Sequence, residues 1–172
     1  LVVYDTATYW SLFGQGVILL LIQIGGMGII TIAIAIAVVS GRKIGLMQRS
    51  TMQEAISAPT VGGIVRRTQF IIRTTILIEI IGAALLAPVF CRDFGFWKGI
   101  WYSLFHSISA FCNAGFDLIG IRAPFSSLTS YSVQPIVNLV IMMLIIAGGI
   151  GFLTWEDIEN QKWHLKKYRM QS

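Results

Sequence analysis

A run of apolar residues without a charged side chain covers residues 13–39, and it constrains the fold more than any other feature of the sequence. A helix needs roughly 20 apolar residues to cross a bilayer, so this run can span it with tilt or with a projecting end. Only 12% of the chain is charged, against about 25% in soluble domains. The sequence therefore predicts an integral membrane protein, or a piece of one.

Residues 71–90 and 131–153 are also apolar and predict a second and a third span. Residues 40–67 are polar, basic and punctuated by Gly, Pro and Ser, which predicts a loop. Residues 118–130 predict an irregular connection, and residues 155–172 a charged tail. Signals for the ends of helices are the candidate N-caps Asp5, Thr6, Thr8, Ser130 and Ser132 and a first-turn proline, Pro135.

Lys and Arg are divided unevenly among these connections. Ten of the 13 lie in residues 40–73 and in the tail, and only Arg92, Lys98 and Arg122 lie elsewhere. By the positive-inside rule, loop 41–67 and the C-terminus are cytoplasmic and the N-terminus is outside. The net charge of +5 is thus interpreted as a topology signal, and no nucleic-acid partner is expected.

Residues 97–117 read WKGIWYSLFHSISAFCNAGFD. Apolar residues have helical spacing over 99–111, which is too short for a span, and the following CNAGF has neither helical nor strand period. Irregular backbone at membrane depth is tolerated where protein buries it or where it lines a wet cavity. Carbonyls in such a cavity can replace the hydration shell of a cation. The stretch therefore predicts a re-entrant pore hairpin that forms one wall of a cation filter.

An alternative for residues 97–117 is an amphipathic helix that lies on the membrane interface, with CNAGFD as an ordinary glycine-terminated C-cap. The aromatic residues of the stretch fit this alternative, because Trp and Tyr are enriched at membrane interfaces. The stretch alone does not decide between the two.

An internal repeat favours the filter. Residues 17–31 read VILLLIQIGGMGIIT and residues 140–154 read VIMMLIIAGGIGFLT, with eight of fifteen positions identical. One hairpin cannot enclose an ion, whereas repeated hairpins can each supply a wall. The shared glycines are expected to be structural, as small residues that let helices approach closely. They are Gly25, Gly26 and Gly28 in the first copy and Gly148, Gly149 and Gly151 in the second.

The predicted fold class is therefore an all-α integral membrane protein, built from span–pore hairpin–span repeats around a central pore. Residues 1–40 hold an outer entry and the last helix of a preceding repeat, 41–67 a cytoplasmic loop, 68–154 one complete repeat, and 155–172 a cytoplasmic tail. On this interpretation the chain begins part-way through a repeat.

The motifs SAFCNAGFD, LIQIGGMG and AGGIGF, together with VVYDT and GRKIGLMQRSTMQEA, resemble the Trk/Ktr/HKT superfamily of potassium transporters. The resemblance is closest to the membrane subunit of the bacterial Ktr/Trk uptake systems and runs over essentially the whole chain. It implies four repeats around one pore, with backbone carbonyls that face potassium and Gly115 as the filter glycine. The implied filter residues are Cys112, Asn113, Ala114, Gly115 and Phe116.

The resemblance also implies a multi-pass plasma-membrane protein that forms a homodimer and contacts a cytoplasmic nucleotide-binding regulatory ring. Potassium would be the transported ion, sodium remains open, and no cofactor is expected on this chain. Rival interpretations are a membrane-bound enzyme, an electron-transfer subunit, and a structural subunit without an ion pathway. The first two need paired His, acids or thiols inside the spans, and the chain offers few.

Asp117, Glu79 and His106 are ionisable residues of the predicted hairpin or of a predicted span. Asp117 directly follows the filter segment and is either a pore-mouth acid that attracts cations or a solvated loop acid. Glu79 lies inside a predicted span, where ionisable residues are costly; a structural hydrogen bond to the hairpin helix is preferred over a transport role. His106, on the hairpin helix, is expected to be a hydrogen-bonded packing residue.

Overall fold

The computed structural model describes residues 3–28, 64–121, 123–150 and 155. The chain divides into two compact units, Leu1–Gly26 with Ile76–Gly149, and Met27–Thr75 with Ile150–Ser172. Every regular element in the described residues is a helix, so the all-α prediction is confirmed for this part of the chain. Most of the predicted loop 41–67 and nearly all of the tail lie outside the described residues.

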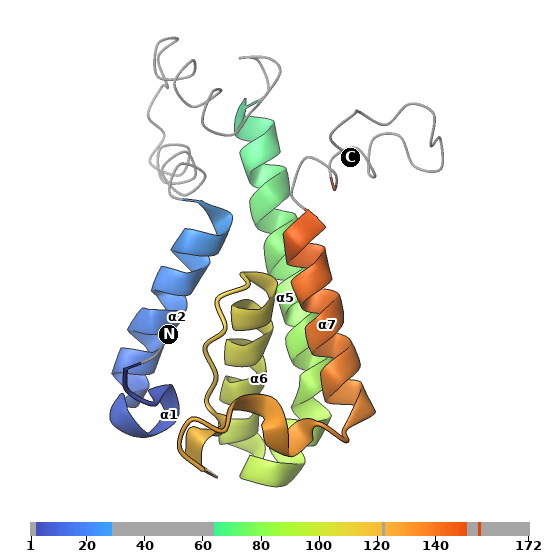
Figure 1. Ribbon diagram of the computed structural model, residues 1–172. Helices are drawn as coiled ribbons and strands as arrows, with labels where there is room; N and C mark the ends of the chain where they lie inside the picture. Colours follow the sequence, from blue (N-terminus) through green and yellow to red (C-terminus); the bar gives the residue numbers. More distant parts are fainter. Residues whose placement is uncertain (1–2, 29–63, 122, 151–154, 156–172) are drawn as a thin grey trace. The chain divides into compact units, whose positions relative to one another are not determined.

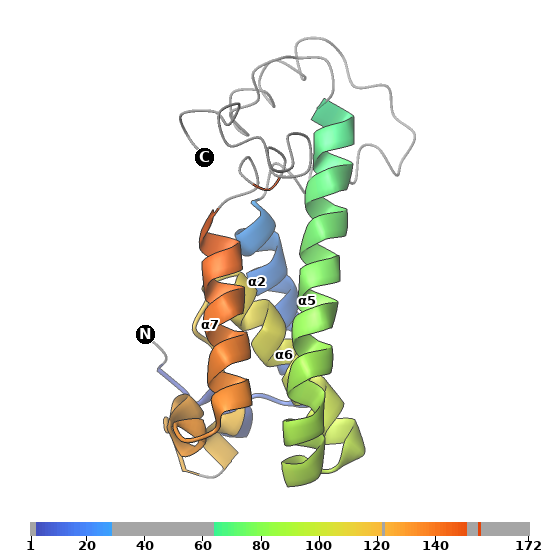
Figure 2. The same cartoon turned by 90° about the vertical axis from the view of Figure 1, so that its right-hand side faces the viewer.

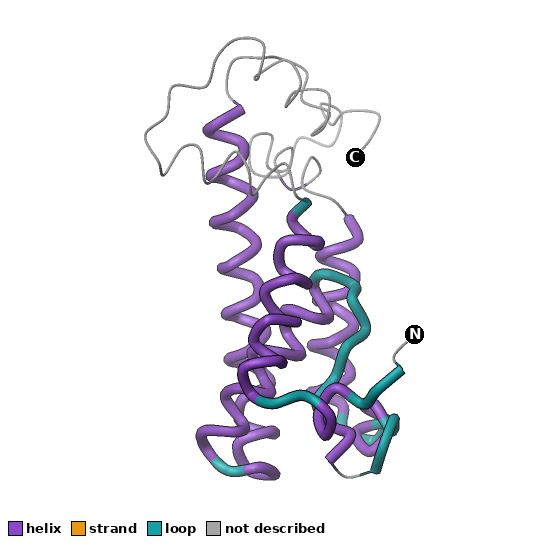
Figure 3. The backbone as a smooth tube through the Cα atoms, turned by 90° about the vertical axis from the view of Figure 1, so that its left-hand side faces the viewer, coloured by secondary structure: helices purple, strands orange, loops and turns teal. Residues whose placement is uncertain are grey.

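Four longer helices carry the structure: α2 (Leu12–Met27), α5 (Ile64–Phe94), α6 (Phe96–Phe111) and α7 (Pro135–Ile150). Figure 1 shows α6 in the middle of the first unit, with α2 on one side and α5 and α7 on the other. In the view of Figure 2, α5 and α7 stand on either side of α6. The chain after α6 turns back along the helix, as the teal segment in Figure 3 shows. The hairpin predicted at residues 97–117 therefore has a helix as its first arm and irregular backbone as its second.

Helix α5 is longer at both ends than the span predicted at 71–90. It begins at Ile64 and continues to Phe94, and its part Thr68–Phe94 is long and apolar enough to cross a membrane. Charged residues near its ends do not stop it, because arginine is a good helix former. It ends where Gly95 takes a φ of 82°, which glycine adopts without steric cost.

Helix α7 begins later than predicted, at Pro135 instead of residue 131. Proline is favoured at the first helical position because its missing N–H would be unpaired there anyway. The preceding residues form a separate 3₁₀ helix, η2 (Ser127–Tyr131), and the predicted irregular connection also holds η1 (Ile119–Ile121). The hydroxyl of Tyr131 donates to Asp93 Oδ2 at 2.8 Å, which joins η2 to the end of α5.

The core of the first unit surrounds α6, and α2 and α7 are less buried. Ten of its sixteen residues are buried, from Gly99 to Phe111. On α2 and α7, by contrast, large apolar side chains are exposed, such as Leu20 at 58% and Leu139 at 60%. At a rise of about 1.5 Å per residue, α6 is roughly 24 Å long, shorter than a bilayer's hydrocarbon core of about 30 Å. Helices α2 and α7 have the same length of 16 residues as α6 in the described part of the chain, so it is the burial of α6, and not its length, that fits the predicted hairpin.

Helix α1 (Thr6–Tyr9) is capped by Asp5, one of the candidate N-caps. Asp5 Oδ1 accepts hydrogen bonds from the N–H groups of Ala7 at 2.9 Å and Thr8 at 3.1 Å. Its second oxygen, Oδ2, accepts from the N–H of Phe125 at 2.9 Å. Burial acts to raise the pKa of Asp5, but these donors outweigh burial and hold the pKa below its ordinary value. One carboxylate thus joins the start of the chain to the connection that follows the hairpin.

We expect Asp5→Ala to lower the free energy of unfolding by about 1–2 kcal/mol, because it removes a helix cap and the bond to Phe125. Asp5→Asn keeps the capping oxygen but turns an amide towards the Phe125 N–H, so its loss should be smaller. Because the folded pKa is lowered, the contribution of Asp5 is present at neutral pH and disappears as the pH falls through that value. Denaturant unfolding of the purified full-length protein in detergent measures both variants. Equal stability of Asp5→Ala and wild type at pH 7 would refute this account of Asp5.

Candidate functional site

The end of α6 is closed by a Schellman motif. The N–H of Asn113 donates to the carbonyl of Ala110 at 3.1 Å, and the N–H of Ala114 donates to the carbonyl of Ser109 at 2.9 Å. This pair of bonds defines the motif, which places the residue after the C-cap in the left-handed region. Asn113, with a φ of 53°, takes that place. A C-cap is therefore present here, as the alternative of an interfacial helix expects. Its left-handed residue is Asn113, and not Gly115.

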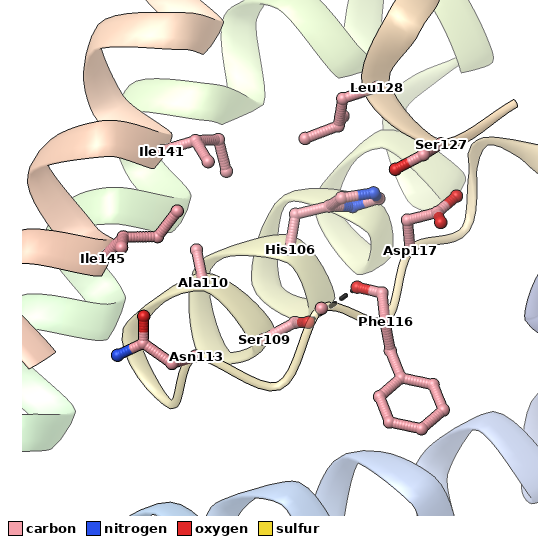
Figure 4. A pocket seen from close by; sticks show the side chains of 11 residues that line it. His106, Ser109, Ala110, Asn113, Phe116, Asp117, Ser127, Leu128, Ile141 and Ile145 are labelled. Atoms are coloured by element: carbon pink, nitrogen blue, oxygen red, sulfur yellow. Dashed lines mark hydrogen bonds between the residues drawn. The ribbon is translucent and has the colours of Figure 1, made fainter. Parts of the chain in front are cut away.

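Gly115 makes a second bend beyond the cap. Its φ is 74°, and a Cβ added there would meet nothing within 4 Å. Backbone conformation, and not lack of space, thus favours glycine at this position. The next carbonyl, that of Phe116, accepts a hydrogen bond of 2.6 Å from Ser109 Oγ on α6, drawn as the dashed line in Figure 4. The segment between Asn113 and Phe116 is therefore fastened to α6 at both ends.

The carbonyl oxygens between these two hydrogen-bonded ends have no donor among the described residues. Those of Cys112, Asn113, Ala114 and Gly115 accept no hydrogen bond from any described part of the chain. Asn113 and Gly115 are also exposed. Carbonyl oxygens that are accessible and have no protein donor can bind water or a cation from outside the chain. Four of the five predicted filter carbonyls meet this condition, and that of Phe116 already has a protein donor.

Glycines of the two repeated motifs pack against the base of this segment. A Cβ at Gly26, on α2, would overlap the side chain of Cys112, and a Cβ at Gly148, on α7, would overlap the carbonyl oxygen of Phe111. Close approach from both sides therefore needs glycine at these two positions.

The other shared glycines differ. A Cβ at Gly25 or Gly149 would meet nothing within 4 Å, and Gly28 has a φ of 82° at the end of α2. Gly151 lies outside the described residues. In the matched repeats Gly25 corresponds to Gly148 and Gly26 to Gly149, so the two copies use different members of the motif against this hairpin.

His106 holds the outer part of the hairpin. The residue is 2% exposed, and Nδ1 lies 2.7 Å from the carbonyl of Tyr102, while Nε2 accepts from the N–H of Leu118 at 3.3 Å. These partners assign the proton to Nδ1 and leave the ring neutral. Asp117 Oδ1 accepts from the N–H of Ile119 at 3.0 Å, so this acid also supports the local turn.

A pocket of about 220 Å³ lies beside the hairpin. Figure 4 shows His106, Ser109 and Asp117 on one side of it and Ile141 and Ile145 of α7 on the other. The described residues contain no cluster of three or more His, Cys, Asp or Glu side chains that could hold a metal ion.

Glu79, 4% exposed, lies behind the first residue of the segment. Its backbone carbonyl accepts from Ser107 Oγ on α6 at 2.7 Å. Its carboxylate accepts from Gln23 Nε2 on α2, at 2.9 Å to Oε1 and 3.0 Å to Oε2. Cys112 Sγ lies 4.0 Å from Oε1, at the limit of a hydrogen bond from sulfur. The hydrogen bond between α5 and the hairpin helix thus comes from the backbone of Glu79, while its side chain binds α2.

The model of the TrkH family, described as a cation transport protein, matches residues 1–169. This chain belongs to the TrkH family. The family is one of membrane transporters and not of enzymes.

Curated relatives carry related names. The chain is 45% identical over 158 residues to "Ktr system potassium uptake protein B" of Bacillus subtilis, covering 92% of this chain and 34% of the relative. It is 40% identical over 154 residues to "Potassium/sodium uptake protein NtpJ" of Enterococcus hirae, covering 90% and 33%. A Ktr system potassium uptake protein B of Vibrio alginolyticus is 32% identical over 156 residues, covering 91% and 33%. The chain thus spans about a third of the length of the curated relatives it matches.

Gly148→Ala should lower the stability of the full-length protein by about 1–3 kcal/mol, because the new methyl group would press on the Phe111 carbonyl. Gly16→Ala is the matched control, since Gly16 is also helical and a Cβ there meets nothing within 4 Å. It should be neutral or stabilising, as alanine is the better helix former. Thermal unfolding in detergent compares the two. Equal melting temperatures would show that α7 does not need glycine against the hairpin.

Proposed function

We propose that this chain forms one wall of a potassium pathway in a membrane-embedded uptake protein. The observation that carries the proposal is the row of four free carbonyls at Cys112, Asn113, Ala114 and Gly115, held between the cap of α6 and the Ser109–Phe116 bond. Carbonyl oxygens are the groups with which potassium filters replace the hydration shell of the ion. No covalent chemistry is involved, and the protein acts by holding oxygens in place.

Helix α6 contributes to the electrostatics of this wall. The C-terminus of a helix carries the equivalent of roughly half a negative charge, because its last carbonyls are not all paired. In α6 this end leads directly into the free segment. The helix therefore favours a cation beside the segment without placing a formal charge there. Asp117 follows the segment and would add a carboxylate at the pore mouth.

The names of the relatives support potassium as the transported ion. Each of the three names a potassium uptake protein, and one of them also names sodium. Sodium is therefore retained as a second ion that the pathway could carry. One wall cannot enclose an ion, so the complete filter would combine this hairpin with those of other repeats in the same polypeptide.

The proposal includes the topology and partners predicted from the sequence. The protein would be a multi-pass plasma-membrane protein, with residues 68–154 as one complete repeat and loop 41–67 and tail 155–172 on the cytoplasmic side. The name "Ktr system" of two relatives supports a membrane subunit that works with other components. We infer a homodimer whose opening is controlled by a cytoplasmic nucleotide-binding ring.

Gly115→Ala in the full-length protein should abolish potassium uptake or its selectivity over sodium. Alanine at a positive φ costs about 1–2 kcal/mol and would rotate the neighbouring carbonyls. The control is Gly95→Ala, at the other end of α6, because Gly95 has a φ of 82° and equally open surroundings. Growth on limiting potassium and ion uptake by a strain without its own uptake systems measure both variants. Wild-type uptake and selectivity in Gly115→Ala would contradict the filter assignment.

A further inference from the structure

A buried polar contact joins three elements behind the free carbonyls. Gln23 on α2 donates through Nε2 to both oxygens of Glu79 on α5, and the Cys112 thiol lies 4.0 Å from one of those oxygens. Glu79 is 4% exposed. Hydrogen bonds between buried polar groups are strengthened by the low dielectric around them. The contact is therefore a firm connection between α2 and α5 at the level where the free segment begins.

The surroundings leave Cys112 little freedom to move. Gly26 lies one turn beyond Gln23 on α2, and a Cβ there would overlap the Cys112 side chain. On the opposite side, Ser107 Oγ fixes α6 to the backbone of Glu79 at 2.7 Å. A shift of α2 relative to α5 would therefore press on Cys112 or release it, and would move its free carbonyl.

Packing alone does not require this polar pair. In the aligned repeat, residues 17–31 against 140–154, the position of Gln23 is taken by Ile146. The two helices thus share their glycines but not this amide. Burying a carboxylate and an amide costs free energy that an apolar pair would not. The hydrogen bond between Gln23 and Glu79 therefore joins α2 to the hairpin repeat. Helix α7 has an isoleucine, Ile146, at the corresponding position.

We propose that Gln23 and Glu79 are positioning residues for the filter. Their hydrogen bond fixes the distance between α2 and α5, and so the place of the Cys112 carbonyl, which sets how well this wall discriminates potassium from sodium. The inference rests on the proposed function. It adds that discrimination depends on a contact outside the ion pathway, between the last helix of one repeat and the first helix of the next. In carbonyl-lined filters, selectivity follows from the spacing and the field of the oxygens.

The decisive variant replaces both partners by leucine, Gln23→Leu with Glu79→Leu, in the full-length protein with its natural partners. Removing both halves of the buried pair leaves only the weak donor of the Cys112 thiol without its acceptor, so the protein should still reach the membrane. We expect the KM for potassium to rise about fivefold, as for the loss of one hydrogen bond, and the potassium/sodium ratio of kcat/KM to fall. The maximal rate per protein should change by less than about twofold, because the pathway itself is intact.

Three single variants complete the test. Glu79→Gln can still accept from Gln23 and should keep the wild-type KM and ion ratio. Glu79→Asp is one methylene shorter and introduces no apolar side chain, so the variant should fold. It should raise the KM for potassium, as the double variant does. Gln15→Leu is the matched control on α2: Gln15 accepts from Trp101 Nε1 at 2.9 Å, away from the free segment. It should lower the melting temperature and leave the ion ratio unchanged.

The outcomes separate this inference from the proposed function. If wild-type protein takes up potassium and Gly115→Ala does not, the filter assignment holds. The variants of Gln23 and Glu79 then test the positioning role. Wild-type KM and ion ratio in both the double variant and Glu79→Asp would overturn that role. So would a Glu79→Gln variant as impaired as the double variant, because the charge and not the hydrogen bond would then matter.

Discussion

Backbone polar groups need partners wherever water is excluded, and the first unit of this chain is organised by how that need is met at the end of α6. The Schellman bonds pair the N–H groups of Asn113 and Ala114, and the Ser109 hydroxyl takes the carbonyl of Phe116. Between these bonds the carbonyls have no donor among the described residues. The hairpin is thus rigid at its ends and chemically open in its middle, which is the combination that a cation site made of backbone oxygens requires.

The glycine motifs show how an apolar assembly brings helices close to such a segment. Gly26 admits the Cys112 side chain against α2, and Gly148 admits the Phe111 carbonyl against α7. These are different positions of the same repeated motif, so the two copies contact one hairpin through different faces. A Cβ added at Gly25 or Gly149 would meet nothing within 4 Å.

Much of this could be predicted from the sequence where the signal is local. Loss of helical periodicity located the end of α6 at Phe111, and Asp5 and Pro135 were recognised because caps and first-turn prolines act on adjacent residues. The extra length of α5 was missed, since arginines within a helix resemble arginines in a loop. The left-handed residue was expected at glycine, and asparagine also tolerates that conformation. The partner of Glu79 could not be predicted, although Gln23 was visible as the most polar residue of its span, because which helix faces which is decided by tertiary packing.

The most direct test of the account is to locate the ion. Anomalous scattering from rubidium or thallium, which replace potassium, can be measured on crystals of the full-length protein. The account predicts a peak within coordination distance of the carbonyl oxygens of Cys112, Asn113, Ala114 and Gly115. Ion density that avoids these oxygens, or that is coordinated by side chains elsewhere in the protein, would contradict it.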